Sequence, residues 1–331
     1  MTSAQVLAID SGGSGVRVAV APADGDGPPL TWSSPEPVRT TSGGIDARGL
    51  LGRVLPAARE LLRRAQAREC AAVCVGAAGM AGLGDELRAV LPAALHETLG
   101  TRRLALASDA VTAYAGAIGQ TPGAVVAAGT GLVALGTDLT PGTGWRRADG
   151  WGHLLGDCGG GAWIGRAGLE AALRAHDGRD GGSAALLARL ETVLGPAEEL
   201  PGLLYPRADR PALLASFAPE VARCAGDCPV ARDVLRSAAR HIAGAAAAVC
   251  RRPAPDGSAD PSPAVAVTGG LLGLGEPLLV PLREQLRMQL PHARPADAEG
   301  TPLDGALCLA AALLTERLLL PVDGTLLRVI G

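Results

Sequence analysis

The sequence predicts a duplicated, two-domain α/β fold with a ligand cleft between the halves, and three observations carry this prediction. The length of 331 residues exceeds what one compact core usually holds. A β-hairpin closed by a glycine turn occurs twice, once around Asp10–Gly15 and again around Gly129–Gly131. Each hairpin is followed by alternating strand and helix patterns. A repeated hairpin of this kind is typical of a duplicated fold that binds its ligand between the copies.

The first half shows both strand and helix periodicity. Val16, Val18 and Val20 alternate as in a strand, and the apolar residues that begin at Leu50 recur at helical spacing. The expected elements are strands at 6–9 and 16–20, a third strand after residue 29, a helix over 50–65, strands at 72–76 and 104–107, and a helix over 110–119.

The second half begins in the same way and then becomes mostly helical. We expect strands at 124–128 and 133–136, a helix over 162–174, further helices to residue 249, a strand at 264–267 and two final helices. The domains are predicted at 1–118 and 119–331, with the last helix packing back on the first domain.

The charge and the cysteines exclude several classes of protein. The chain has no lysine, which excludes a Walker A loop and a pyridoxal Schiff base. The net charge of −3 gives no basic surface for nucleic acid. The absence of a signal peptide or a long apolar run predicts a cytoplasmic protein with no membrane contact. The seven cysteines are expected to be reduced, with Cys224 and Cys228 one turn apart on a helix.

Glycine turns between strands can bind phosphate, because successive backbone amides can point at an anion. Taken alone, Asp10–Gly15 fits either a hairpin turn or a phosphate site. A dinucleotide fingerprint is excluded, since the glycines lead into a strand and not a helix. A third glycine turn, Thr268–Gly270, follows a late strand.

Three such turns in this order resemble the actin, hexokinase and heat-shock chaperone superfamily. The segment Gly150–Asp157, continued by Ala162–Gly165, resembles the GGWGxxxGDEGS and WI pattern of the N-acetylglucosamine kinase and BadF/BadG ATPase family. The resemblance implies a ribonuclease-H-like (actin-like ATPase) fold in each half, ATP and Mg²⁺ as cofactors, and a homodimer. It also implies phosphorylation of an amino sugar at its 6-hydroxyl, with N-acetyl-D-glucosamine first and glucosamine or another hexosamine second.

The resemblance implies a role for each matching residue. Asp109 would be the catalytic base and Asp10 would hold Mg²⁺ through water; their alternative roles are a helix cap and a turn contact. The sugar would contact Asp109, Asp157, the segment Gly150-Trp151-Gly152 and the loop Ser42-Gly43-Gly44. The phosphates and adenosine would contact Gly12, Gly13, Ser14, Gly129, Thr130, Gly131, Gly269 and Gly270. Ala218 would lie under the base or serve in helix packing.

Four residues depart from the family pattern. Cys158 and Gly160 stand where the pattern has glutamate and serine, and Leu132 and Val133 replace a polar pair after the second turn. We expect these departures to affect the binding of the sugar more than the binding of the ATP phosphates. Two alternatives of other classes stay open, an ATPase that activates a radical dehydratase and a non-catalytic sugar sensor.

Overall fold

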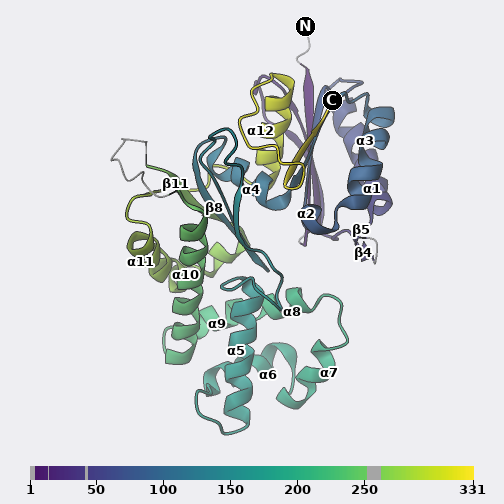
Figure 1. Ribbon diagram of the computed structural model, residues 1–331. Coiled ribbons are helices and arrows are strands. Elements are labelled where there is room, and N and C mark those ends of the chain that lie inside the picture. Colours follow the sequence, from purple (N-terminus) through teal and green to yellow (C-terminus); the bar gives the residue numbers. More distant parts are fainter. Residues whose placement is uncertain (1–3, 14, 42–43, 252–261) are drawn as a thin grey trace. The chain divides into compact units, whose positions relative to one another are not determined.

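The computed structural model describes residues 4–13, 15–41, 44–251 and 262–331 (Figure 1). The chain divides into two compact units. Unit 1 comprises residues 1–125, 137–145 and 296–331, and unit 2 comprises residues 126–136 and 146–295. The domain boundary expected at residue 118 stays a prediction. The division into compact units groups residues that pack together and does not identify the point where one domain ends.

Unit 1 is built on a six-stranded sheet with the order β13-β7-β6-β1-β2-β3. Strands β1, β6 and β7 are parallel to one another, while β2, β3 and β13 run antiparallel to their neighbours. The strands are β1 (Gln5–Gly12), β2 (Gly15–Pro22), β3 (Leu30–Ser34), β6 (Ala72–Ala77), β7 (Arg103–Ser108) and β13 (Leu327–Ile330). A short hairpin of β4 (Thr40–Thr41) and β5 (Gly44–Ile45) lies outside this sheet.

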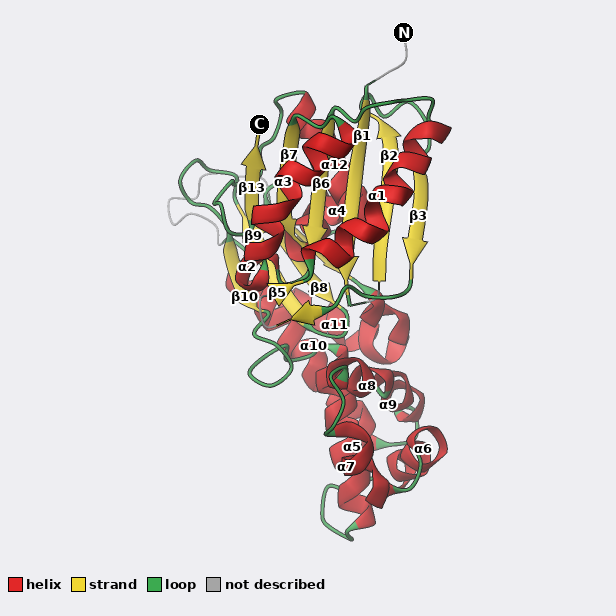
Figure 2. Ribbon diagram, turned by 90° about the vertical axis from the view of Figure 1, so that its right-hand side faces the viewer, coloured by secondary structure: helices red, strands yellow, loops and turns green. Residues whose placement is uncertain are grey.

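Helices cover both faces of this sheet (Figure 2). Helices α1 (Ala47–Arg64) and α3 (Asp85–Leu99) pack on one face, with the short α2 (Met80–Leu83) beside them. Helices α4 (Asp109–Ile118) and α12 (Pro302–Leu314) pack on the other face and against each other. The last helix of the chain is therefore part of unit 1.

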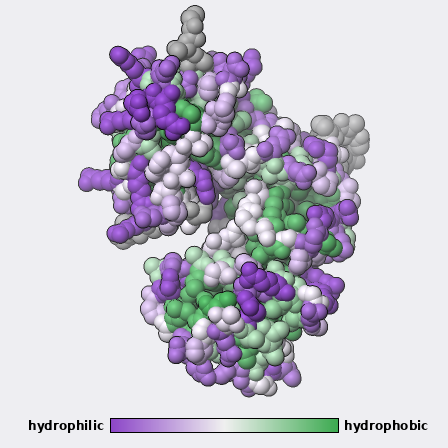
Figure 3. Space-filling model, turned by 180° about the vertical axis from the view of Figure 1, so that it is seen from behind, coloured by the Kyte–Doolittle hydropathy of each residue, from purple (hydrophilic) through white to green (hydrophobic). Residues whose placement is uncertain are grey.

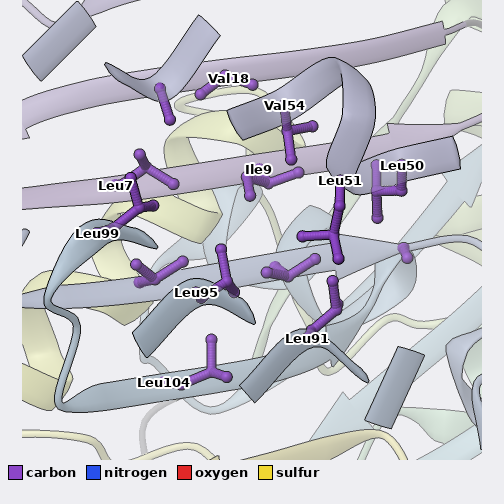
Figure 4. Packing of buried hydrophobic residues seen from close by; sticks show 14 of the residues in the cluster. Leu7, Ile9, Val18, Leu50, Leu51, Val54, Leu91, Leu95, Leu99 and Leu104 are labelled. Carbon is purple, nitrogen blue, oxygen red and sulfur yellow. The ribbon is translucent and has the colours of Figure 1, made fainter. Parts of the chain in front are cut away.

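The core of unit 1 forms where α1 and α3 meet the sheet (Figure 4). Leu7 and Ile9 of β1 alternate toward this layer, and Leu50 and Val54 of α1 recur at helical spacing to meet them. All four side chains have no exposed surface. Residues two apart on the strand and four apart on the helix therefore point into the same buried layer.

A second sheet has five strands in the order β10-β9-β8-β11-β12; residues 126–136 of the β8–β9 hairpin and all of β10, β11 and β12 belong to unit 2. The strands are β8 (Gly123–Ala128), β9 (Leu132–Thr137), β10 (Arg146–Asp149), β11 (Ala264–Thr268) and β12 (Arg294–Pro295). The helices are α5 (Gly161–His176), α6 (Ala184–Leu194), η1 (Ala197–Glu199), α7 (Leu200–Leu204), α8 (Arg210–Ser216), α9 (Ala218–Cys224), α10 (Pro229–Val249), η2 (Gly270–Leu274) and α11 (Glu276–Gln289). On the face drawn in Figure 3, hydrophobic surface is more extensive over unit 2 than over unit 1.

One sequence-based expectation about the cysteines is wrong. Cys224 ends α9 and Cys228 is the N-cap of α10, so the two thiols do not share one helix. The chain turns between them, and the Cys228 amide donates to the Cys224 carbonyl at 2.9 Å. All seven cysteines are free. Within the part of the chain that the structure describes, no helix is both long and apolar enough to cross a bilayer.

Candidate active site

The parallel strands of unit 1 bring two carboxylates to one edge of the sheet. Ser11 of β1 lies in register with Ala77 of β6, and Ala77 with Ser108 of β7. Asp10 is one residue before this row, and Asp109 is one residue after it. Because parallel strands end at the same edge, the backbone ladders place both aspartates there.

Asp10 is a buried ionisable residue with one cationic partner. It is 5% exposed, and its Oδ2 accepts a hydrogen bond from Arg17 Nη1 at 3.0 Å. The antiparallel register places Arg17 directly opposite Asp10 on β2. Burial raises the pKa of Asp10 above its ordinary value, and the Arg17 guanidinium opposes that rise.

Asp109 is the first residue of α4 and is half-buried. The residue that caps the helix is Ser108, whose side chain accepts from the Val111 amide at 3.3 Å. Asp109 Oδ1 accepts from the Ala110 amide at 2.9 Å. The capping role that the sequence left open for Asp109 is therefore filled by Ser108.

The rest of the predicted unit 1 site lies partly outside the described residues. Gly12 ends β1 and Gly13 follows it in an exposed position. Ser14, Ser42 and Gly43 lie outside the described residues. Gly44 begins β5, and β5 approaches the turn after β6, because a Cβ on Gly79 would lie 3.6 Å from Ile45 Cδ1.

The second glycine turn, Gly129–Gly131, is held against the start of α5. The Gly129 amide donates to the Gly131 carbonyl at 3.0 Å, which closes the turn. The first two amides of α5, of Gly161 and Ala162, donate to the Gly129 and Thr130 carbonyls, both at 2.8 Å. Thr130 is exposed at the tip of the turn. Thr130 therefore lies at the surface of a turn whose backbone is held by hydrogen bonds.

Asp157 joins this turn to the predicted sugar segment. Its Oδ1 accepts from the Gly152 amide at 3.0 Å, and a Cβ on Gly131 would lie only 2.3 Å from its Oδ2. Gly131 is therefore needed for the close approach of this carboxylate. Burial raises the pKa of Asp157, and the bond from the Gly152 amide opposes that rise.

Two residues that the sequence analysis missed hold the backbone of this segment. Asp149 accepts from the amides of Asp157 and Cys158 at 2.6 and 3.0 Å. Arg147 donates to the carbonyls of Asp149 and Gly150. The Arg147 guanidinium also lies over the Trp151 ring, 5.2 Å from its centroid. Two charged residues directly before a glycine-rich stretch were the available signal.

The third glycine turn lies beside the second one in the unit 2 sheet. Gly269 follows β11 with φ of 110°, and a Cβ there would lie 2.2 Å from the Ala128 carbonyl oxygen, just before Gly129. Gly270 begins η2. Ala218 is 2% exposed at the start of α9, and a Cβ on Gly165 of α5 would lie 3.5 Å from its amide nitrogen. Its surroundings are those of helix packing.

Most of the residues that depart from the family pattern lie where the surrounding structure leaves little room for other side chains. Gly160 is the N-cap of α5, and a Cβ there would lie 2.8 Å from the carbonyl carbon and oxygen of Gly131. A serine would therefore press on the turn. Leu132 is buried, and Val133 packs against Gly150, whose Cβ would lie 2.9 Å from Val133 Cγ2.

A shallow cavity of about 380 Å³ adjoins this segment within unit 2. Its lining includes Asp149, Trp151, Cys158, Arg240 and His241. Burial and the Asp149 charge raise the pKa of the Cys158 thiol, so it is less reactive as a nucleophile than an ordinary cysteine.

The sequence profile of the BadF/BadG/BcrA/BcrD ATPase family matches residues 7–310. The chain belongs to this family. The N-acetylmuramic acid/N-acetylglucosamine kinase of Clostridium acetobutylicum is 32% identical to this family member over 111 residues. That match spans 34% of this chain and 35% of the kinase, about a third of the relative's length.

Solved structures similar to this BadF/BadG-family protein include two sugar-kinase-related proteins. A Chromobacterium violaceum protein, described as a candidate N-acetylglucosamine kinase, has a TM-score of 0.70 at 26% identity over 94% of this chain and 100% of that one. A ROK-family glucokinase from Streptomyces griseus, solved with glucose and AMPPNP, has a TM-score of 0.52 at 20% identity over 94% and 99% of the two chains. The predicted ribonuclease-H-like, actin-like ATPase fold is thereby confirmed.

Proposed function

We propose that this protein is an ATP-dependent kinase that phosphorylates the 6-hydroxyl of an amino sugar, with N-acetyl-D-glucosamine as the first candidate. The observation that carries the proposal is the placement of Asp109. It follows a central parallel strand, at the same sheet edge as Asp10, and its neighbour Ser108 supplies the helix cap. The similarity to amino-sugar kinases over part of the chain supports the choice of substrate.

Asp109 would accept the proton of the sugar hydroxyl. The hydroxyl oxygen attacks the γ-phosphorus of ATP, the bond from that phosphorus to the bridging oxygen breaks, and ADP leaves. A carboxylate is suited to this task because it need only accept the proton as the new bond forms. Asp109 is half-buried, which limits the water around it without removing access.

The remaining predicted residues would bind and orient. Asp157 would accept hydrogen bonds from sugar hydroxyls, beside the backbone of Gly150 and Trp151. The amides and hydroxyls of Gly12, Gly13, Ser14 and the turn Gly129–Gly131 would contact the phosphates. Gly269 and Gly270 would lie against the adenosine, while Ala218 would contribute through packing.

Asp10 fits a role in holding Mg²⁺. Mg²⁺ prefers hard oxygen ligands and usually keeps several of its waters, and Asp10 offers a buried carboxylate at a strand end. When bound, the cation would neutralise phosphate charge. Arg17 would keep Asp10 ionised and oriented for this task.

The test is a screen for ATP consumption across hexoses and amino sugars with Mg²⁺, followed by Asp109→Asn. We expect kcat to fall by about 10²-fold or more, with the sugar dissociation constant nearly unchanged, because proton transfer is lost and binding is kept. The control is Asp85→Asn, an exposed aspartate in the first turn of α3. Unchanged phosphorylation by Asp109→Asn would contradict the assigned base.

The same preparation distinguishes the alternatives of other classes. A radical-dehydratase activator would carry iron when prepared without oxygen, and a sugar sensor would bind sugar without consuming ATP. We expect neither result. A homodimer and a cytoplasmic location remain part of the proposal, to be tested by sedimentation and by cell fractionation.

A further inference from the structure

We propose that Asp149 is a positioning residue that fixes the turn carrying Asp157 and thereby sets the affinity for the sugar. This inference rests on the proposed function, in which Asp157 binds the sugar. Asp149 itself is the last residue of β10, so its backbone is anchored in the unit 2 sheet by pairing with Val133.

Asp149 uses both carboxylate oxygens on the turn. Oδ1 accepts from the Asp157 amide at 2.6 Å, and Oδ2 accepts from the Cys158 amide at 3.0 Å. Two hydrogen bonds to one ionised group fix both the distance and the orientation of the two peptides. Asparagine has one acceptor oxygen, so it cannot offer a separate oxygen to each of the two amides as Asp149 does.

The local backbone is strained in a way that requires such support. Asp149 has φ of 60° and Asp157 has φ of 54°, both in the left-handed region that non-glycine residues rarely adopt. The contact also depends on Gly156, since a Cβ there would lie 2.5 Å from Asp149 Oδ1. The carboxylate of Asp149 thus stabilises a backbone conformation that costs free energy for a residue other than glycine.

The position of the turn determines where the Asp157 carboxylate points. That carboxylate lies against Gly131 and accepts from the Gly152 amide. Release of the Asp157 backbone would move its side chain away from both the glycine turn and the Trp151 segment. Asp149 therefore acts on the sugar site through Asp157 and needs no contact with the substrate.

Asp149 also contributes charge. Burial raises the pKa of Asp157 and the Asp149 carboxylate raises it further, while the Gly152 amide and His153 lower it. Ionised Asp157 offers more acceptor sites to sugar hydroxyls than the protonated acid does. Asp149→Asn should therefore extend sugar binding to lower pH, because the Asp157 pKa falls when the neighbouring negative charge is removed.

The test compares Asp149→Ala and Asp149→Asn with the wild-type chain. Hydrogen exchange should accelerate about tenfold or more at the amides of Asp157 and Cys158 in Asp149→Ala, and less in Asp149→Asn, which retains one acceptor. The KM for the sugar should rise about tenfold or more in Asp149→Ala while the KM for ATP stays within about twofold. In Asp149→Asn the acidic limb of kcat/KM should shift to lower pH.

The matched control is Asp233→Asn, an exposed aspartate on α10 that pairs only loosely with Arg236, at 3.7 Å between Oδ1 and Nη1. It should change none of these quantities. Unchanged exchange at Asp157 and Cys158 in Asp149→Ala would overturn the proposal, whatever the substrate. Equal KM changes for sugar and ATP would also overturn it. If the wild-type chain phosphorylates none of the sugars, the proposed function fails, and the exchange result still decides whether Asp149 holds the turn.

Discussion

The candidate residues of the two units are held in place by different means. In unit 1, Asp10 and Asp109 lie at the ends of parallel strands whose registers are fixed by backbone hydrogen bonds. In unit 2, the segment from Gly150 to Asp157 follows β10 outside the strands and is held by side chains bonded to its backbone. The strand positions should therefore tolerate the loss of a single side chain nearby, whereas the loop should not. Asp109 also depends on Ser108, because it begins the helix that Ser108 caps.

Two glycines test this difference with the largest expected effect. A Cβ on Gly160 would lie 2.8 Å from backbone atoms of Gly131, whereas a Cβ on Gly76 of β6 would lie 2.7 Å from the side chain of Thr112. Each change to alanine should lower the free energy of unfolding by about 1–3 kcal/mol, as overpacking does. Urea denaturation measures both.

Rescue separates the two cases. Thr112→Ala should restore part of the stability of Gly76→Ala, because the obstructing atoms are at the end of a side chain. No side-chain change should rescue Gly160→Ala, since the obstruction is backbone, and nucleotide binding should weaken. Gly244→Ala in α10 is the control; with only Gln289 Oε1 nearby at 3.6 Å, it should stabilise the helix by about 0.5–1 kcal/mol. Equal rescue at both sites would refute the distinction.

Removing a helix cap should cost less stability, and each unit has one serine cap that can be compared with the other. Ser108 caps α4 in unit 1, and Ser183 caps α6 in unit 2 by accepting from the Leu186 amide at 3.2 Å. Each serine-to-alanine change should cost about 1 kcal/mol of stability. Only Ser108→Ala should also lower kcat, because Asp109 is the next residue. A similar loss of kcat in Ser183→Ala would point to a general effect of destabilisation.

The smallest effect concerns the pH dependence of stability at Asp10. Its pKa is raised in the folded chain, so its contribution to stability is present at acid pH and is lost as pH rises through the folded pKa. At neutral pH the buried charge therefore costs stability. Asp10→Asn should melt at a slightly higher temperature than the wild-type chain at pH 7, with no gain near pH 4, while losing activity. A lower melting temperature at pH 7 would show that the Arg17 ion pair outweighs burial.

The sequence predicted the parts of the fold that depend on local periodicity. The two hairpins, the helix after Ser108 and the helix after Gly160 were all expected, because strand alternation and helical spacing are visible in short windows. Strand β13 was not expected, since Leu327 pairs with Ala107 from far along the chain. The break between Cys224 and Cys228 was missed because both flanking segments favour helix.

The residues of the candidate site also fall into those that the sequence predicted and those that it did not. Asp10 and Asp109 could be found because each follows an apolar strand, and the parallel topology then brings them to one edge. Asp149 and Arg147 were missed, since their charge before a glycine-rich stretch indicates no role until the folded loop shows which backbone groups they bond. A carboxylate that accepts from amides leaves only a weak sequence pattern, here a charged residue next to glycine.

The exposure of the Trp151 ring has a practical consequence. The chain has four tryptophans, and Trp151, at 68% exposed, is the most exposed of them, while the other three are partly buried. An indole in water emits at longer wavelength than one that is shielded, so a sugar that covered this ring would shift the emission of the whole protein to the blue. Ligand arrival could then be followed optically on the unlabelled chain, and the slow variant Asp109→Asn would allow the bound state to be titrated before turnover consumes it.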